Sequence, residues 1–160
     1  MPVSSTPQRH GARGAETTDS SGATRRPDRV LTSAERGAWC ATASFPPQPP
    51  NVARARRLTR TALAAWGAPH LTDSAELLVS ELVTNAVRYG RGAVSLTLTL
   101  TDSALQISVA DFGPAMPQMR EASEEDSNGR GLAIVSALCQ RWTVTTRLTG
   151  KTVSCWLDVR

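Results

Sequence analysis

AELLVSELVTNAVRYG, residues 75–90, is the stretch from which the rest of the chain can be interpreted. Its apolar residues recur in two adjacent rows at four-residue spacing, which are Leu78, Leu82 and Ala86, and Val79, Val83 and Val87. Two such rows form the apolar stripe of an amphipathic helix. Gly90 follows the last row, where a residue in the left-handed conformation commonly ends a helix. The stretch therefore predicts a helix that packs one face on a core and ends in a left-handed cap at Gly90.

The other side of this helix carries three polar residues in one row. Glu81, Asn85 and Arg88 are spaced i, i+4 and i+7, so their side chains lie one above another. A carboxylate can take a proton, an amide oxygen can ligate a hard cation, and a guanidinium can meet phosphate oxygens. The row therefore suits a polyphosphate that chelates a divalent cation. A solvated helix face is the alternative, because helix surfaces commonly carry such residues.

The size and composition of the chain limit the classes of protein to which it can belong. Its 160 residues are enough for one domain with a buried core. No apolar run approaches the roughly 20 residues of a membrane span, and the N-terminus lacks the apolar segment of a secretory signal. The net charge of +4 is modest and comes with no nucleic-acid motif. We therefore expect no membrane insertion and no direct nucleic-acid binding, and the arginines suit a solvated face or an acidic protein partner.

Three cysteines, Cys40, Cys139 and Cys155, show no metal-ligand spacing and cannot all pair with one another. Each lies in or beside an apolar segment. Buried, inert thiols in a reducing cytoplasm are therefore expected.

Two regions differ in composition. Residues 1–38 are rich in Ser, Thr, Arg, Gly and Ala and show no apolar periodicity, so they predict a disordered basic tail. Residues 39–160 contain the periodic segments and are expected to form one domain.

Strands are predicted on both sides of the turn at Asp102-Ser103. Residues 94–101 alternate between apolar and hydroxyl-bearing side chains, and residues 105–109 repeat the alternation, which is typical of an antiparallel hairpin. Further strands are predicted over 39–45, 142–146 and 152–159, and helices over 51–66 and from residue 129. Strands that occur as hairpins favour an α+β fold, a two-layer sandwich with helices on one face of a mixed, mostly antiparallel sheet.

Three short motifs add chemistry to the polar row. Asp111-Phe-Gly113 follows a strand, where the carboxylate can accept from an exocyclic amine and the glycine lets a flat ring approach the main chain. Residues 129–131, Gly-Arg-Gly, open a helix whose first N–H groups can face an anion. Thr152 follows Gly150-Lys151 at the start of the last strand and can hydrogen-bond a base beside Asp111. Each motif alone is also an ordinary turn, helix start or strand residue.

The order of these motifs resembles the ATP-binding fold shared by gyrase, MutL and sensor histidine kinases, often called the Bergerat fold. Within it, the chain looks most like the small anti-sigma-factor serine/threonine kinases. The matching segments are Glu81-Leu-Val-Thr-Asn85-Ala, Asp111-Phe-Gly113, Gly129-Arg130-Gly131-Leu132 and Gly150-Lys-Thr152-Val. The resemblance covers residues from about 40 to 159 and leaves the tail outside it.

The resemblance implies a role for each matching position. Asn85 would ligate a Mg²⁺ ion that bridges the phosphates of ATP, and Glu81 would be the general base for the attacking hydroxyl. Asp111 would hold the adenine amine, with Thr152 assisting and Gly113 allowing close approach.

The phosphate pocket is implied in the same way, at the hinge of an ATP lid formed by roughly residues 114–128. Its lining would be Gly129, Arg130, Gly131 and Leu132, and Arg88 would also reach phosphate. The chain departs from the family at Ala115, where the first glycine box normally has a second glycine. This departure predicts a stiffer lid and weaker nucleotide binding.

The function implied by the resemblance is that of an ATP- and Mg²⁺-dependent protein serine/threonine kinase in the bacterial cytoplasm. It would phosphorylate an anti-sigma-factor antagonist protein, sequester a sigma factor when not bound to that antagonist, and pair as a homodimer. One alternative is a non-catalytic ATP-binding module that sequesters a transcription regulator by contact. Another is the detached catalytic domain of a two-component sensor, which would transfer phosphate to histidine and against which the short loop 114–128 argues. A full sensor histidine kinase is not expected, because neither His10 nor His70 lies in a phosphoacceptor context.

Overall fold

The structure, a computed structural model, describes residues 31–35, 37–113 and 127–160. In this part of the chain the strands are β1 (Leu31–Glu35), β2 (Ala38–Phe45), β3 (Val94–Leu100), β4 (Ala104–Asp111), β5 (Arg141–Arg147) and β6 (Gly150–Asp158). The helices are α1 (Pro50–Ala65), a short 3-10 helix (Pro69–Leu71), α2 (Thr72–Tyr89) and α3 (Ser127–Leu138).

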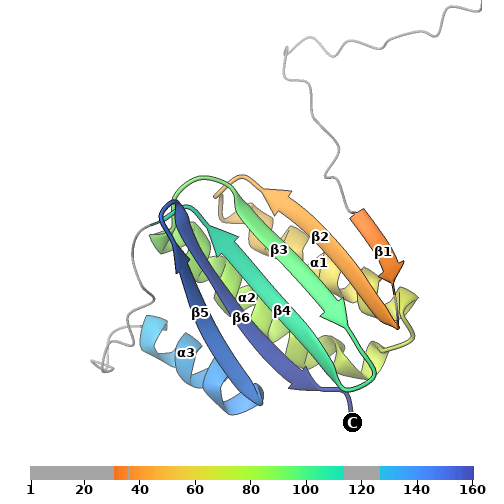
Figure 1. The fold of residues 1–160 in the computed structure, drawn as a ribbon. Coiled ribbons are helices and arrows are strands. Elements are labelled where there is room, and N and C mark those ends of the chain that lie inside the picture. The colour runs from red at the N-terminus through yellow and green to blue at the C-terminus, as the bar shows by residue number, and fades with distance from the viewer. Residues whose placement is uncertain (1–30, 36, 114–126) are drawn as a thin grey trace, which may run out of the picture.

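These strands form one sheet in the order β1-β2-β3-β4-β6-β5 (Figure 1). Every neighbouring pair among them is antiparallel. The mostly antiparallel sheet that we expected is therefore antiparallel throughout its described strands. Strand β4 lies inside the sheet, paired with β3 on one side and β6 on the other, and its last residue, Asp111, pairs with Lys151 of β6.

The three helices cover one face of the sheet, which gives the two-layer α+β sandwich expected from the sequence (Figure 1). Helix α1 contacts β2, α2 contacts β3 and β4, and α3 contacts β5. The burial pattern of β3 and β4 explains the arrangement, because their residues alternate strictly between buried and half-buried. The buried face carries the apolar residues of the predicted alternation. The other face carries hydroxyls in β3, and Gln106 and Ser108 between alanines in β4.

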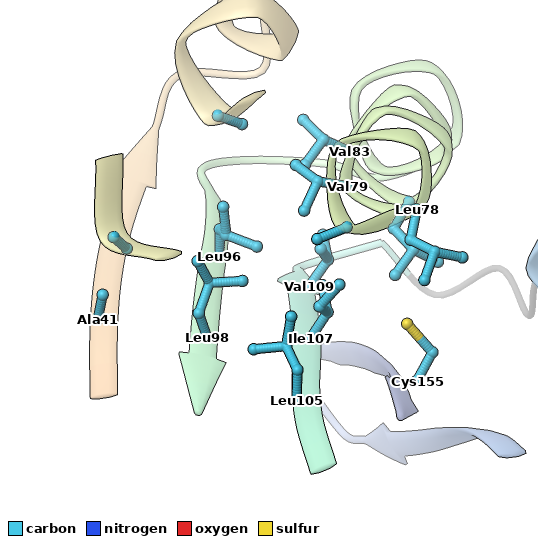
Figure 2. Close-up of a cluster of buried hydrophobic side chains, with 14 of the residues drawn as sticks. Ala41, Leu78, Val79, Val83, Leu96, Leu98, Leu105, Ile107, Val109 and Cys155 are labelled. Carbon is cyan, nitrogen blue, oxygen red and sulfur yellow. The ribbon is translucent and has the colours of Figure 1, made fainter. Parts of the chain in front are cut away.

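The core lies between α2 and the middle of the sheet (Figure 2). Leu78, Val79 and Val83 of α2 are fully buried and point toward the side chains of β3 and β4 in Figure 2. The fully buried sheet residues below them are Leu96, Leu98, Leu105 and Ile107. The apolar rows of residues 75–90 therefore face the core as predicted, and the residues of the polar row are half-buried or exposed.

The boundary drawn at residue 38 is wrong, because Leu31–Glu35 forms strand β1 and β2 begins at Ala38. Strand β1 pairs with β2 in an antiparallel register from Leu31 opposite Thr42 to Glu35 opposite Ala38. An edge strand is held by main-chain hydrogen bonds to one neighbour, so it needs no strong apolar pattern of its own. The disorder predicted for residues 1–30 concerns residues outside the described part of the chain.

Cys155 is buried in β6, whereas Cys40 and Cys139 are half-buried. Burial raises the pKa of the Cys155 thiol above its ordinary value, and the neighbouring Cys139 raises it further. Burial also raises the pKa of Cys139, against a smaller lowering by its hydrogen bond with Cys155. Thiols with raised pKa values are poor nucleophiles at neutral pH, which agrees with the inert behaviour expected for both residues.

The helices in the described part of the chain include none with the length and apolar character needed to cross a membrane.

Candidate functional site

Three segments that are distant in the sequence meet where β4 ends. Asp111 is the last residue of β4 and lies opposite Lys151 of β6. The next residue, Phe112, donates its main-chain N–H to the carbonyl oxygen of Arg91, just beyond α2, at 2.9 Å. The carboxyl end of α2, the end of β4 and the start of β6 are therefore joined around Asp111.

The Asp111 side chain is only 2% exposed, and both of its oxygens have partners. Oδ1 accepts a hydrogen bond from the main-chain N–H of Gly113 at 2.7 Å. Oδ2 lies 3.2 Å from the Nζ of Lys151, whose side chain is 7% exposed. A buried carboxylate needs such partners, because an unpaired charge in a low-dielectric interior is costly. These contacts fix the orientation of the carboxylate and leave further lone pairs for a ligand.

Three glycines, Gly90, Gly113 and Gly150, lie close around Asp111. We call these three residues the glycine cradle. A Cβ on Gly90 would lie 2.6 Å from the Cγ of Asp111, and one on Gly113 would lie 2.8 Å from the Cα of Gly90. A Cβ on Gly150 would lie 2.0 Å from the carbonyl oxygen of Asp111. Since these contacts are to backbone or to a fixed carboxylate, side chains are excluded from the cradle.

Gly90 does not adopt the left-handed cap that the sequence predicted. Its φ of −80° and ψ of −179° are extended, conformations open to any residue. The requirement for glycine is instead steric, since a Cβ there would lie 2.4 Å from the carbonyl oxygen of Ala86. Gly90 is therefore a close-approach glycine that brings the end of α2 onto Asp111.

The polar row of α2 runs toward this end of the helix. Glu81 and Asn85 are half-buried, and Arg88, in the last turn, is exposed. Ala86, the neighbour of Asn85, is buried in the core, and its carbonyl oxygen accepts a hydrogen bond from the main-chain N–H of Gly90 at 3.0 Å. The structure thus brings the helix end that follows Asn85 to Asp111, and it leaves Glu81 one turn further back along α2.

Residues 129–132 lie in the first turns of α3, which begins at Ser127 and not at Gly129. Helix α3 contacts α2 and lies on the same face of the sheet (Figure 1). The side chains of Arg130 and Leu132 are outside the described part of the structure, as are all of residues 114–126, which include Ala115 and most of the predicted lid.

The structure does not bring Thr152 to Asp111, which corrects the assisting role predicted for it. Thr152 lies opposite Ala110, and successive side chains of a strand point to opposite faces. Thr152 is therefore on the outer face of the sheet, whereas Lys151 is on the inner face beside Asp111. Sequence reasoning missed Lys151, although the alternation Lys151, Val153, Cys155 and Leu157 would have placed it on the buried face.

These residues fit an adenine ring and a nucleotide-bound cation. Asp111 supplies a fixed acceptor for an exocyclic amine, and the glycine cradle leaves flat main-chain surface beside it. Within the described residues, no three His, Cys, Asp or Glu side chains gather as metal ligands. A magnesium ion held by one or two protein oxygens together with phosphate oxygens and water is the common arrangement at nucleotide sites, and Asn85 suits it.

A separate pocket of about 530 Å³ lies at the end of the sheet opposite to Asp111. Trp39 and Trp66 line it and stack with ring centroids 6.5 Å apart, and His70 lies beside them. None of the predicted site residues lines this pocket.

The fold is a one-sided antiparallel sheet whose inner strand ends in a buried carboxylate beside the end of helix α2, which defines an α+β sandwich domain with a candidate site at that strand end. A family model described as a histidine kinase-like ATPase domain matches residues 45–156. The chain therefore belongs to the histidine kinase-like ATPase domain family, and its resemblance to that family is confirmed.

Solved structures are similar in fold at low identity. The crystal structure of the RsbU and RsbW domains of Rv1364c from Mycobacterium tuberculosis is 20% identical with a TM-score of 0.54, over 74% of this chain and 35% of that one. The Acinetobacter baumannii histidine kinase AdeS is 19% identical with a TM-score of 0.43, over 56% of this chain and 47% of that one. The histidine kinase domain of the Erythrobacter litoralis EL346 blue-light activated histidine kinase is 21% identical with a TM-score of 0.42, over 72% and 62%.

This chain thus spans about a third of the length of the first of these structures. A search of curated proteins finds no match to it.

Proposed function

We propose that this domain is an ATP- and Mg²⁺-dependent protein serine/threonine kinase of a bacterial partner-switching pathway. The observation that carries the proposal is the buried Asp111 carboxylate, fixed by Gly113 and surrounded by the glycine cradle at the end of α2. Membership of the histidine kinase-like ATPase family supports ATP as the nucleotide. The serine/threonine specificity rests on the motifs shared with anti-sigma-factor kinases.

The chain's own residues divide the work of such a site. Asp111 would accept a hydrogen bond from the adenine amine, and Gly113 would let the ring lie against the main chain. Asn85 would ligate Mg²⁺, and Arg88 would meet phosphate oxygens. Glu81 would take the proton of the attacking hydroxyl, with ATP supplying the phosphoryl group.

The first turns of α3 would complete the phosphate pocket. Gly129 lies in the first turn of α3, whose main-chain N–H groups have no intrahelical partners and suit an anion. Gly131 follows in the next turn and belongs to the same motif. Arg130 and Leu132 belong to the same motif and would line the pocket with them.

The proposed partners are an anti-sigma-factor antagonist, which would be the phosphoacceptor, and a sigma factor that the domain sequesters. The domain would act in the cytoplasm and pair as a homodimer. The likeness in fold to the RsbU and RsbW domains of Rv1364c is in keeping with such a setting and supports it at the level of the fold alone.

Nucleotide binding is tested first, by thermal or urea unfolding with and without Mg²⁺-ATP. A ligand at about 100 times its Kd should raise the free energy of unfolding by about 2.7 kcal/mol. Asp111→Asn should reduce this gain. An unchanged unfolding curve in saturating Mg²⁺-ATP would contradict the proposal at its base.

Phosphotransfer is tested with antagonist proteins recovered by pull-down from the native host. Glu81→Ala should lower transfer to serine by about 10²-fold or more while Mg²⁺-ATP binding is retained, because a general base acts only in the chemical step. Asp73→Ala, which removes an exposed carboxylate at the other end of α2, is the matched control and should transfer normally. ATP binding without transfer would favour the non-catalytic alternative, in which the domain sequesters a regulator by contact.

A further inference from the structure

Lys151 is a nearly buried cation to which the proposed function gives no role. Its side chain is 7% exposed, and the partner found for its Nζ within the described residues is the Oδ2 of Asp111, at 3.2 Å. An ammonium group has three N–H donors, so this ion pair uses one of them. It is also the only lysine in the sequence, where the other 17 basic residues are arginines.

The position of Lys151 is set by the register of the two central strands. Asp111 and Lys151 are directly opposite each other in the β4–β6 pair, and both are buried on the face that the helices cover. Gly150 precedes Lys151 and belongs to the glycine cradle, so the ammonium and the carboxylate both lie beside the cradle.

A purely structural ion pair is the competing explanation. A buried ion pair is weak evidence for stability, because desolvation of the two charges offsets most of their attraction. Asp111 also receives a hydrogen bond from Gly113, so the carboxylate has one partner without Lys151. The ammonium therefore has N–H donors beyond this ion pair, and these could serve a ligand bound beside Asp111.

The pair presents a hydrogen-bond acceptor next to a hydrogen-bond donor. The edge of adenine presents the complement, since its exocyclic amine donates and the adjacent ring nitrogen N1 accepts. We propose that Lys151 donates to N1 of adenine while Asp111 accepts from the amine, so that the two residues together determine the base specificity of the site. This inference rests on the proposed binding of ATP.

The test compares ATP with 1-deaza-ATP, in which N1 is replaced by a C–H group and the amine is kept. Calorimetric titration of the wild-type protein should give a Kd for 1-deaza-ATP that is about tenfold or more higher than that for ATP, as expected for one lost hydrogen bond to a charged donor. In Lys151→Met the Kd for ATP should rise and the ratio of the two Kd values should fall close to one.

A matched control and a second variant separate the loss of the N1 contact from a general loss of folding. Thr145→Val changes an exposed residue of β5 on the outer face and should keep the wild-type ratio. Should Lys151→Met fail to fold because it leaves the Asp111 charge unpaired, the double variant Asp111→Asn/Lys151→Met leaves no buried charge and keeps an amide oxygen for the amine. For this double variant the ratio of the two Kd values should also be close to one. Asp111→Asn alone keeps Lys151, so it should still bind ATP more tightly than 1-deaza-ATP.

Selective ¹⁵N labelling of lysine gives an independent readout, because the single lysine yields a single side-chain ammonium signal. That signal should shift on addition of Mg²⁺-ATP and shift much less with 1-deaza-ATP. Equal Kd values for the two nucleotides in the wild-type protein would overturn the role of Lys151 and leave ATP binding intact. Absence of binding for both would overturn the proposed function, and this inference with it.

Discussion

Asp111 is surrounded by main chain rather than by side chains, and this determines which residues near it can vary. Gly90 has an extended conformation that any residue can adopt, so its backbone dihedral angles do not require glycine. The requirement comes only from the neighbouring atoms, the Ala86 carbonyl and the Asp111 carboxyl. Substitution at Gly90 therefore tests close packing separately from backbone strain.

We predict that Gly90→Ala lowers the free energy of unfolding by about 3 kcal/mol, because the new methyl group would displace Asp111 or the end of α2. Nucleotide binding should be lost as well. Gly67→Ala is the control, since Gly67 has a φ of 72° and no atom within 4 Å of an added Cβ. It should lower the free energy of unfolding by only about 1 kcal/mol, the cost of holding alanine in the left-handed conformation. Equal costs in urea unfolding would show that Gly90 is not tightly packed.

The residues at Asp111 also show where sequence reasoning stopped. The motif order placed Asp111, Gly113 and the end of α2 near one another without any coordinates. It placed Thr152 beside Asp111, whereas the structure places Lys151 there, because the motif includes both residues and does not fix which one faces the helices. That choice depends on pairing between distant strands, which a local pattern does not specify.

At the scale of elements, the patterns of α2, β3 and β4 predicted the structure well because each has a strong period. Two adjacent residues of α2 show how sharply that period divides the helix. Leu78 is fully buried, whereas Leu77 is 41% exposed. Two leucines at adjacent positions of α2 therefore lie in opposite environments, one in the core and one largely exposed.

Leu78→Ala should lower the free energy of unfolding by about 2–5 kcal/mol, because it removes buried methyl groups and leaves a cavity above the sheet. Leu77→Ala should change it by less than about 0.5 kcal/mol. Chemical denaturation of both variants measures the difference. Similar losses in the two would mean that α2 packs with a different face on the core.

Two elements were harder to predict for physical reasons. Strand β1 has little apolar alternation, and it exists because the edge of β2 offers main-chain partners. Helix α2 follows directly on the 3-10 helix Pro69–Leu71, and its first residue has no side-chain cap. Ends that are fixed by neighbouring structure leave no signature in the local sequence.

At the scale of the whole molecule, the thiols of β6 and of the α3–β5 connection link stability to pH. The pKa of Cys155 is raised above its ordinary value of 9.0 by burial and then by Cys139. Above that ordinary value the unfolded chain loses the thiol proton while the folded chain keeps it. The unfolded state then binds fewer protons, so the free energy of unfolding falls as pH rises.

We predict a loss of up to about 1.4 kcal/mol per pH unit from this group once the pH exceeds the ordinary thiol value. Urea unfolding of the wild type at a series of pH values from neutral to alkaline should show the decline. Cys155→Ala should make the decline shallower, and Cys40→Ala, which changes a half-buried thiol of β2, should leave it as it is. Parallel curves for the wild type and Cys155→Ala would refute this linkage.

The pairing of β4 with β6 limits how the residue opposite Asp111 can change. Val153, Cys155 and Leu157 lie on the same face of β6 as Lys151 and are all buried in the core. A shift of β6 by one residue would turn all three toward water, so inserting or deleting a residue in the β5–β6 hairpin cannot simply exchange the ammonium for the hydroxyl of Thr152. Hydrophobic packing along the rest of β6 thus fixes which residue of this strand lies opposite Asp111. Within β6, the polar group at that position can therefore change only by substitution of residue 151 itself.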